Sequence, residues 1–276
     1  MGKRIFVAVL ITLAVLTLTR RMSMNRPRDI RYESGGVEVF HRTVTSQFGK
    51  GRPVLRIKVA GKSGLSCSVL VRMPDGQVER KPLQPDSSGT CEAVLPSMKK
   101  GTRLGYAFLV SEGGRRILRL PPREGRYFIL KYKGHVSRTV LAFHIAFMFA
   151  SFFFMVLAFL GSLRMLKGIE GKQITVNNIR WALALTFIGG WPLGFVLNYQ
   201  AFGPVWEGFP FGYDITDNKT QFMFIFWIIL SLLARGSIYK GDESKDLLDD
   251  RGFAIAVLVC FIVSVIVFLI PHSLSF

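Results

Sequence analysis

The sequence predicts an α-helical membrane protein with five spans that carries an extracytoplasmic all-β domain, an immunoglobulin-like sandwich. Three observations lead to this fold class. Half of the 276 residues are hydrophobic, and they gather in long runs. A stretch of short alternating segments separates the first run from the others. The chain is also strongly basic, with 36 Lys and Arg against 18 Asp and Glu. This combination excludes an ordinary cytosolic enzyme and a disordered chain.

Five runs are apolar enough to cross a hydrocarbon core of about 30 Å, which takes roughly 20 residues of helix. They are 5–18, 139–163, 181–199, 216–234 and 253–270. The fourth is the least apolar, because a helix that crosses there must begin near Thr216 and include Asp217, Asn218 and Lys219. The last four runs form a predicted four-helix transmembrane domain over 139–272.

Residues 1–19 are predicted to be an uncleaved N-terminal signal anchor. Lys3 and Arg4 precede the apolar run, Arg20 and Arg21 follow it, and the sequence after it has no small-x-small cleavage site. The alternative is a cleaved signal peptide, because the apolar stretch is short.

The orientation follows from the Lys and Arg residues of the short loops, which favour the cytoplasm. With five spans, the positive residues within 3–4, 164–180 and 235–251 lie on one side, whereas the loop 200–215 contains none. We therefore expect a bacterial inner-membrane protein with a cytoplasmic N-terminus. Residues 20–138 and the C-terminus are expected in the periplasm.

Residues 30–133 read as a periplasmic β-sandwich domain. Strands are predicted within 54–59, 65–71, 105–110, 116–120 and 126–132, and Pro-Asp-Gly-Gln at 74–77 is a hairpin signal.

Segment 20–138 holds 25 Lys and Arg against 9 Asp and Glu. Outside the cell nucleic acid is not an expected partner, whereas the bilayer and its anionic lipid head groups are. A generic solvated basic surface is the alternative.

Two of the three cysteines lie in this domain. Strand parity places Cys67 and Cys91 on core-facing positions, and an oxidising compartment permits a Cys67–Cys91 disulfide. The alternative is a pair of buried free thiols. Cys260 lies within the fifth run.

Polar residues gather at the outer ends of the last four runs. Their number and type suit a divalent metal such as Zn²⁺, held by His and carboxylate ligands. The candidate metal ligands are His144, His272, Asp214 and Asp217, and the other members of this outer cluster are Trp206, Glu207, Asn218 and Lys219.

Other roles for these residues remain open. Asp214 or Thr216 would also cap a helix, Asp217 would suit its N-terminal dipole, and His272 would hydrogen-bond a carbonyl. A haem held by His144 and His272 is a further alternative.

Three features together resemble an uncharacterised family of bacterial polytopic membrane proteins. They are a β domain that ends in a strand and a glycine before the second run, the stretch Trp-x-Gly-x-Pro-Phe-Gly-x-Asp-x-Thr-Asp-Asn-Lys-Thr at 206–220, and a closing Ile-Pro-His-Ser at 270–273. The resemblance covers roughly residues 45–275. It implies the architecture and highlights these positions, and it implies no activity.

The sequence therefore predicts an integral inner-membrane protein with a basic periplasmic domain and a polar site at the outer face that is a candidate for metal binding, in an envelope-associated binding or accessory role. Another membrane subunit is a possible partner. The alternative is a membrane-embedded metal-dependent hydrolase of a lipid or envelope substrate. The sequence leaves open whether the chain is an enzyme.

Overall fold

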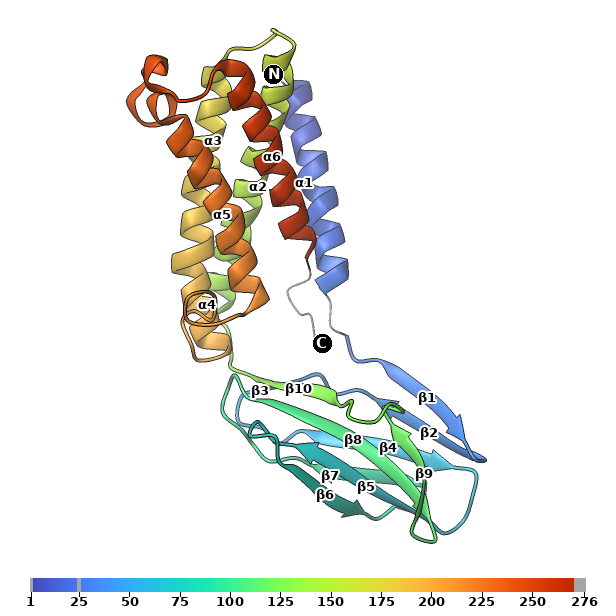
Figure 1. Cartoon of the computed structure of the whole chain (residues 1–276). Helices are drawn as coiled ribbons and strands as arrows, with labels where there is room; N and C mark the ends of the chain where they lie inside the picture. The colour runs from blue at the N-terminus through green and yellow to red at the C-terminus, as the bar shows by residue number, and fades with distance from the viewer. Residues whose placement is uncertain (1, 24–25, 271–276) are drawn as a thin grey trace.

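The chain folds into a bundle of long helices with a β domain at one end, in a computed structural model that describes residues 2–23 and 26–270 (Figure 1). We call the end of the bundle beside the β domain the domain end, and the opposite one the far end. The helices are α1 Gly2–Ser23, α2 Arg138–Leu166, α3 Lys172–Ile188, α4 Gly194–Ala201, α5 Ile215–Leu233 and α6 Asp250–Leu269. Shorter helical turns are the π-helices Gly189–Leu193 and Gly236–Lys240 and the 3₁₀-helix Glu243–Lys245.

Four helical segments within the described residues are long and apolar enough to cross a membrane. They are Gly2–Ser23, Arg138–Leu166, Lys172–Ala201 and Asp250–Leu269. Lys172–Ala201 comprises α3, the first π-helix and α4, so this segment begins well before the predicted run 181–199. The predicted fourth span corresponds to α5, which is not among the four. Its first turns are polar and include Asp217 and Lys219.

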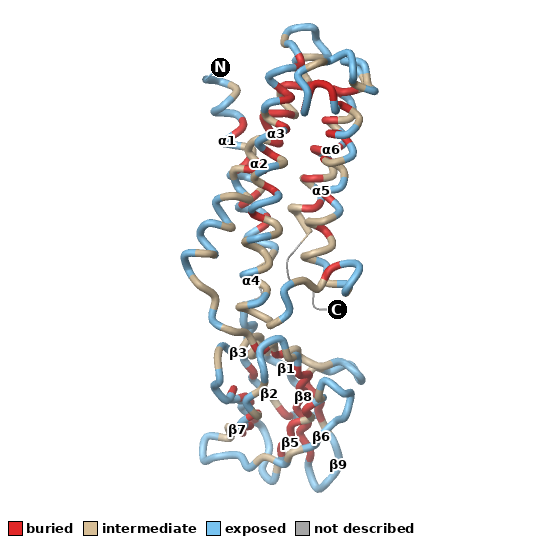
Figure 2. The backbone as a smooth tube through the Cα atoms, turned by 90° about the vertical axis from the view of Figure 1, so that its left-hand side faces the viewer, coloured by how far each residue is buried: buried red, intermediate tan, exposed pale blue. Residues whose placement is uncertain are grey.

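The bundle core combines large apolar side chains with a few buried hydroxyl groups. Phe152, Met155 and Trp227 are almost fully buried, while the outer surface of the bundle stays exposed (Figure 2). The Trp227 indole N–H donates to Ser264 Oγ at 2.8 Å. Such internal hydrogen bonds let polar groups be buried between apolar helices.

The β domain consists of two sheets that face each other. The strands are β1 Asp29–Ser34, β2 Val37–Arg42, β3 Ser46–Phe48, β4 Val54–Ala60, β5 Leu65–Arg72, β6 Val78–Leu83, β7 Thr90–Val94, β8 Arg103–Glu112, β9 Arg115–Leu120 and β10 Phe128–Lys133. One sheet has the order β1-β2-β4-β7. The other has the order β3-β10-β8-β5-β6, with β9 also paired to β8. β4 alternates between exposed and buried residues, as a strand with one core face must.

The core of the domain lies between the two sheets and includes both cysteines. Cys67 on β5 and Cys91 on β7 are buried free thiols, so the predicted disulfide is not formed in this structure. The two side chains nevertheless contact each other. The hydrogen bond from Cys91 lowers the pKa of Cys67, and the same bond, followed by burial, raises the pKa of Cys91. The disulfide therefore stays a prediction about an oxidised form.

Hydrogen bonds hold the segment between β10 and α2 against the C-terminal end of α4. The Gly134 N–H donates to the Ala201 carbonyl at 2.8 Å, and the Ser137 N–H donates to Gln200 Oε1 at 2.8 Å. A Cβ at Gly134 would lie 2.1 Å from the Gln200 carbonyl oxygen, and one at Gly101 would lie 2.4 Å from the Phe202 carbonyl oxygen. Glycine at these two positions lets the domain approach the helix end closely.

Candidate binding cleft

An open cleft of about 1320 Å³ lies between the β domain and the loop that joins α4 to α5. The β domain contributes basic side chains from the ends of β5, β8 and β10 and from the segment before β8. The loop contributes aromatic and acidic side chains. The charged and aromatic lining residues are Arg72, Lys99, Lys100, Arg103, Lys131, Phe202, Trp206, Glu207, Phe211, Tyr213 and Asp214.

The loop wall of the cleft is folded by the carboxylates that the sequence offered as metal ligands. Asp214 precedes α5, and its side chain accepts from Thr216 N at 2.8 Å and Asp217 N at 3.4 Å, which makes it the N-cap of the helix. The Asp217 carboxylate accepts from Asn198 Nδ2 at 3.0 Å and from Glu207 N at 2.8 Å. Both carboxylates are therefore engaged in holding the loop.

Asn218 and Lys219 have similar supporting roles. Asn218 Oδ1 accepts from Phe209 N at 2.6 Å, which fixes the middle of the loop to the first turn of α5. Lys219 is almost fully buried, and its ammonium donates to the carbonyl of Ile270 at the C-terminal end of α6. A cation there is favourable because helix carbonyls lack partners at a C-terminus. Glu207 lines the cleft, and burial, followed by the nearby Asp214, raises its pKa.

Stacked rings connect the loop to the interior of the bundle. Trp206 stacks on Trp191 with ring centroids 6.2 Å apart, and Trp191 contacts Phe224 at 4.5 Å. Trp191 belongs to the π-helix in which Pro192 lacks the backbone N–H of a regular helix. Such single-turn π-helices often occur at functional sites. Here the turn places Trp191 of the helix bundle under the cleft loop.

His144 supports this same turn. Its Nδ1 lies 2.8 Å from the carbonyl oxygen of Gly189, so this nitrogen carries the proton and donates it to the carbonyl. No contact joins His144 to Asp214 or Asp217 among the described residues. His272 lies outside the residues that the structure describes.

The described part of the chain contains no group of three or more His, Cys, Asp or Glu side chains placed to hold a metal ion. Asp214 caps α5, as the alternative to a metal site proposed. Asp217 and His144 are engaged in hydrogen bonds that the sequence did not predict, to the Glu207 N–H and the Gly189 carbonyl. The alternative of a haem also needs His144 as a ligand, and the Nδ1 of His144 is engaged by the Gly189 carbonyl.

The basic wall of the cleft holds two cations directly opposite each other. Arg103 on β8 and Lys131 on β10 are register partners in an antiparallel pair. Like charges in such positions repel and destabilise the sheet. Burial, followed by the nearby Arg103 and Lys133, lowers the pKa of Lys131. The carboxylate nearest Arg103 is that of Asp214, 4.0 Å away across the cleft. No salt bridge to Lys131 forms within the described residues.

Sequence reasoning named Trp206, Glu207 and Asp214 of this cleft but none of its cations. The excess charge of the domain was evident, yet four of the five basic lining residues lie between 99 and 131, in segments that meet only when β8 pairs with β10. One feature of the sequence could have indicated these cations: the pair Lys99-Lys100, which stands next to Gly101 just before a buried strand.

Comparisons with known proteins give no family. No protein-family model and no curated protein matches the chain. Among solved structures eight chains match. One is titled "Crystal structure of Br derivative BhCBM56"; it is 17% identical, and the match covers 37% of this chain and 97% of that chain with a TM-score of 0.24. A likeness of this extent carries no argument about this chain.

Proposed function

We propose that this chain is an integral protein of a bacterial inner membrane, and that its cleft binds the anionic, phosphate-bearing part of a component of the membrane or envelope. The β domain then lies on the periplasmic side, as an immunoglobulin-like sandwich held at the membrane surface. The protein acts as a binding or accessory component of the envelope.

The Lys and Arg residues near the two ends of the bundle support this orientation. Helices α1, α2, α3, α5 and α6 run alternately up and down the bundle (Figure 1). If α5 crosses the membrane with the others, the loops at the far end hold Arg164, Lys167, Arg235 and Lys240, whereas the loop 200–215 at the domain end has no Lys or Arg. Positive loops favour the cytoplasm, so the far end is cytoplasmic under this proposal.

The Arg103–Lys131 pair is the observation that carries the proposal. Two like charges in register, in a cleft with three further cations, cost stability unless something compensates them. The two carboxylates of the opposite wall, Glu207 and Asp214, are outnumbered by these five cations. A phosphate group would accept hydrogen bonds from the Arg103 guanidinium and the Lys131 ammonium together. The cleft is therefore suited to an anion.

The aromatic residues of the loop favour an anion that carries an apolar part. Phe211 and Tyr213 line the cleft and are 83% and 90% exposed. They stand at the mouth of the bundle, where aromatic side chains commonly meet the interface between lipid and water. A lipid head group fits both walls, whereas a free phosphate ion fits only the basic one.

The test is a titration of the detergent-purified protein, with its tryptophan fluorescence as the signal, to which Trp206 at the cleft and three further tryptophans contribute. The probes are dioctanoyl phosphatidylglycerol, dioctanoyl phosphatidylcholine and inorganic phosphate. We expect the anionic lipid to bind and the zwitterionic lipid to bind at least tenfold more weakly. Binding of inorganic phosphate as tight as that of the anionic lipid would instead identify a free anion as the ligand. Equal binding of both lipids, or binding of no probe, would refute the proposal.

A matched pair of variants assigns the binding to the cleft. Arg103→Gln/Lys131→Gln should weaken the anionic lipid about 25-fold, because each basic residue near an anionic head group contributes roughly 1 kcal/mol. Arg115→Gln/Arg123→Gln removes the same charge from exposed positions that do not line the cleft, and it should leave the affinity within about twofold.

The hydrolase alternative gains no support from the described residues. Its proposed ligands His144, Asp214 and Asp217 are engaged elsewhere, and no nucleophile or general base lies among them in an arrangement that would act on a bound lipid.

A further inference from the structure

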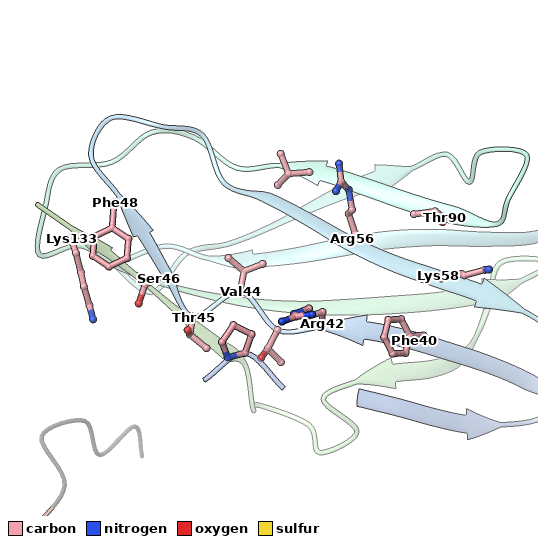
Figure 3. A pocket seen from close by; sticks show the side chains of 13 residues that line it. Phe40, Arg42, Val44, Thr45, Ser46, Phe48, Arg56, Lys58, Thr90 and Lys133 are labelled. Atoms are coloured by element: carbon pink, nitrogen blue, oxygen red, sulfur yellow. The ribbon is translucent and has the colours of Figure 1, made fainter. Parts of the chain in front are cut away.

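A second concave surface lies on the β domain, away from the cleft. This sheet groove, of about 810 Å³, runs along the outward face of β2 and β4 to the edge formed by β3 and the end of β10 (Figure 3). Phe40 and Phe48 line it and are 45% and 56% exposed. Of the residues that the structure describes, none lines both the groove and the cleft.

Four cations and no carboxylate are found among the described residues that line the groove. Arg56 is already paired, with its Nε 2.5 Å from Glu92, and Arg42 lies 3.8 Å from Asp29 with both side chains well exposed. Lys58 and Lys133 form no salt bridge within the described part of the chain. The ammonium of Lys133 lies 5.9 Å from the centre of the Phe48 ring, a cation–π contact that leaves its positive charge open to an anion. Burial also lowers the pKa of Lys133.

The groove lies at the attachment points of the domain to the membrane helices. Pro27 lines it four residues after α1 ends at Ser23, and Lys133 lines it five residues before α2 begins at Arg138. A chain spans at most about 3.6 Å per residue, so these two lining residues lie within roughly 18 Å of the helix ends. The groove is thus close to the head-group layer of any membrane that the helices cross.

We propose that the sheet groove binds the phosphate head group of an anionic phospholipid from the membrane surface. The phosphate would meet Arg42 and Lys133, and the glycerol and first acyl carbons would lie against Phe40 and Phe48. This site orients the β domain on the bilayer, and it does not depend on what the cleft binds.

The side chains favour a lipid over a soluble anionic polysaccharide. The two phenyl rings offer apolar area without a hydrogen-bonding group, which suits acyl carbons. The cations sit beside these rings, as in surfaces that bind anionic membranes through combined apolar and electrostatic contacts. Because the groove lies near the helix ends, it is close to the membrane surface, where the lipid is present at high local concentration.

Photo-crosslinking in nanodiscs tests the site directly. Full-length protein with Phe48→p-benzoylphenylalanine is reconstituted in phosphatidylcholine discs with or without 30% phosphatidylglycerol and irradiated, and lipid adducts are measured by mass spectrometry. We expect phosphatidylglycerol adducts in excess of its share of the lipid. The matched control is Val78→p-benzoylphenylalanine on β6, a similarly exposed position that does not line the groove and should give few adducts.

Charge variants separate this site from the cleft. Combining Phe48→p-benzoylphenylalanine with Arg42→Gln/Lys133→Gln should lower the ratio of phosphatidylglycerol to phosphatidylcholine adducts by up to about 25-fold, since each basic residue contributes roughly fivefold near an anionic surface. Adding Arg103→Gln/Lys131→Gln should leave it unchanged, whether or not the cleft binds lipid. Equal adducts at positions 48 and 78, no preference for phosphatidylglycerol, or loss of adducts on addition of a soluble anionic polysaccharide would overturn the proposal.

Discussion

At the far end of the helix bundle, the ammonium of Lys172 lies 2.7 Å from the carboxylate of Asp246, and both side chains are almost fully buried. Arg4 likewise lies 2.7 Å from Glu170, and Arg180 donates to backbone carbonyls at 2.7 and 2.8 Å. At the domain end the pattern reverses. Lys131 faces Arg103. Arg103 lies at the outer limit of an ion pair with Asp214, at 4.0 Å, and Lys131 forms no salt bridge within the described residues.

The comparison distinguishes two uses of charge in one chain. At the far end, paired charges tie the loops and helix ends together. At the domain end, the cations of the cleft outnumber the carboxylates that could pair with them. Groups placed at a cost in stability mark binding sites more reliably than groups whose partners lie within the fold.

The largest effect on stability is expected from a substitution at the far end of the bundle. Asp246→Leu leaves the ammonium of Lys172 buried without its main partner, so it should lower the free energy of unfolding by about 3–5 kcal/mol. Thermal or denaturant unfolding in detergent measures this change. The double variant Lys172→Met/Asp246→Leu should be clearly more stable than the single one, because no buried charge is then left alone. A loss below about 1 kcal/mol for Asp246→Leu would show that this end does not depend on pairing.

The same contrast explains how far the sequence predicts the molecule. Apolar helices and a β-sheet domain follow from run length and alternation, which are local properties. The strand predicted at 105–110 corresponds to β8, although residues 104–111 are all buried and do not alternate. β6 was not predicted, because it is a polar strand at the edge of its sheet. The cation cluster depends on the register of Arg103 with Lys131. That register joins residues far apart in sequence, so no local pattern contains it.

The second largest effect on stability is expected from a disulfide in the core of the β domain. Oxidation of Cys67 and Cys91 would join β5 of one sheet to β7 of the other, and a disulfide that closes such a loop stabilises by roughly 3 kcal/mol. Protein isolated from an oxidising compartment should show one alkylatable thiol in denaturant, that of Cys260, and three after reduction. Three thiols without prior reduction would mean that the pair stays free.

A pH titration sharpens the contrast at the domain end. Burial, followed by the nearby cations Arg103 and Lys133, lowers the pKa of Lys131 below its ordinary value. Binding of an anion needs the charged ammonium, so the affinity is full at low pH and falls as the pH rises through this lowered pKa. Lys131→Arg keeps its charge at higher pH, so its affinity should persist where that of the wild type has dropped about fivefold. The titration with dioctanoyl phosphatidylglycerol measures both proteins, and identical pH profiles would exclude Lys131 from the site.

The smallest effect gives the most direct test of the claim that the fold tolerates repulsion in the cleft in order to bind an anion. Unfolding of wild type and Lys131→Gln is measured in detergent with and without dioctanoyl phosphatidylglycerol. Without the lipid, Lys131→Gln should be more stable by about 0.5 kcal/mol, because a like-charge cross-strand pair is relieved. With saturating lipid the order should reverse, since the variant binds more weakly. A variant that is less stable than wild type without the lipid, or that gains as much stability from it, would contradict this account.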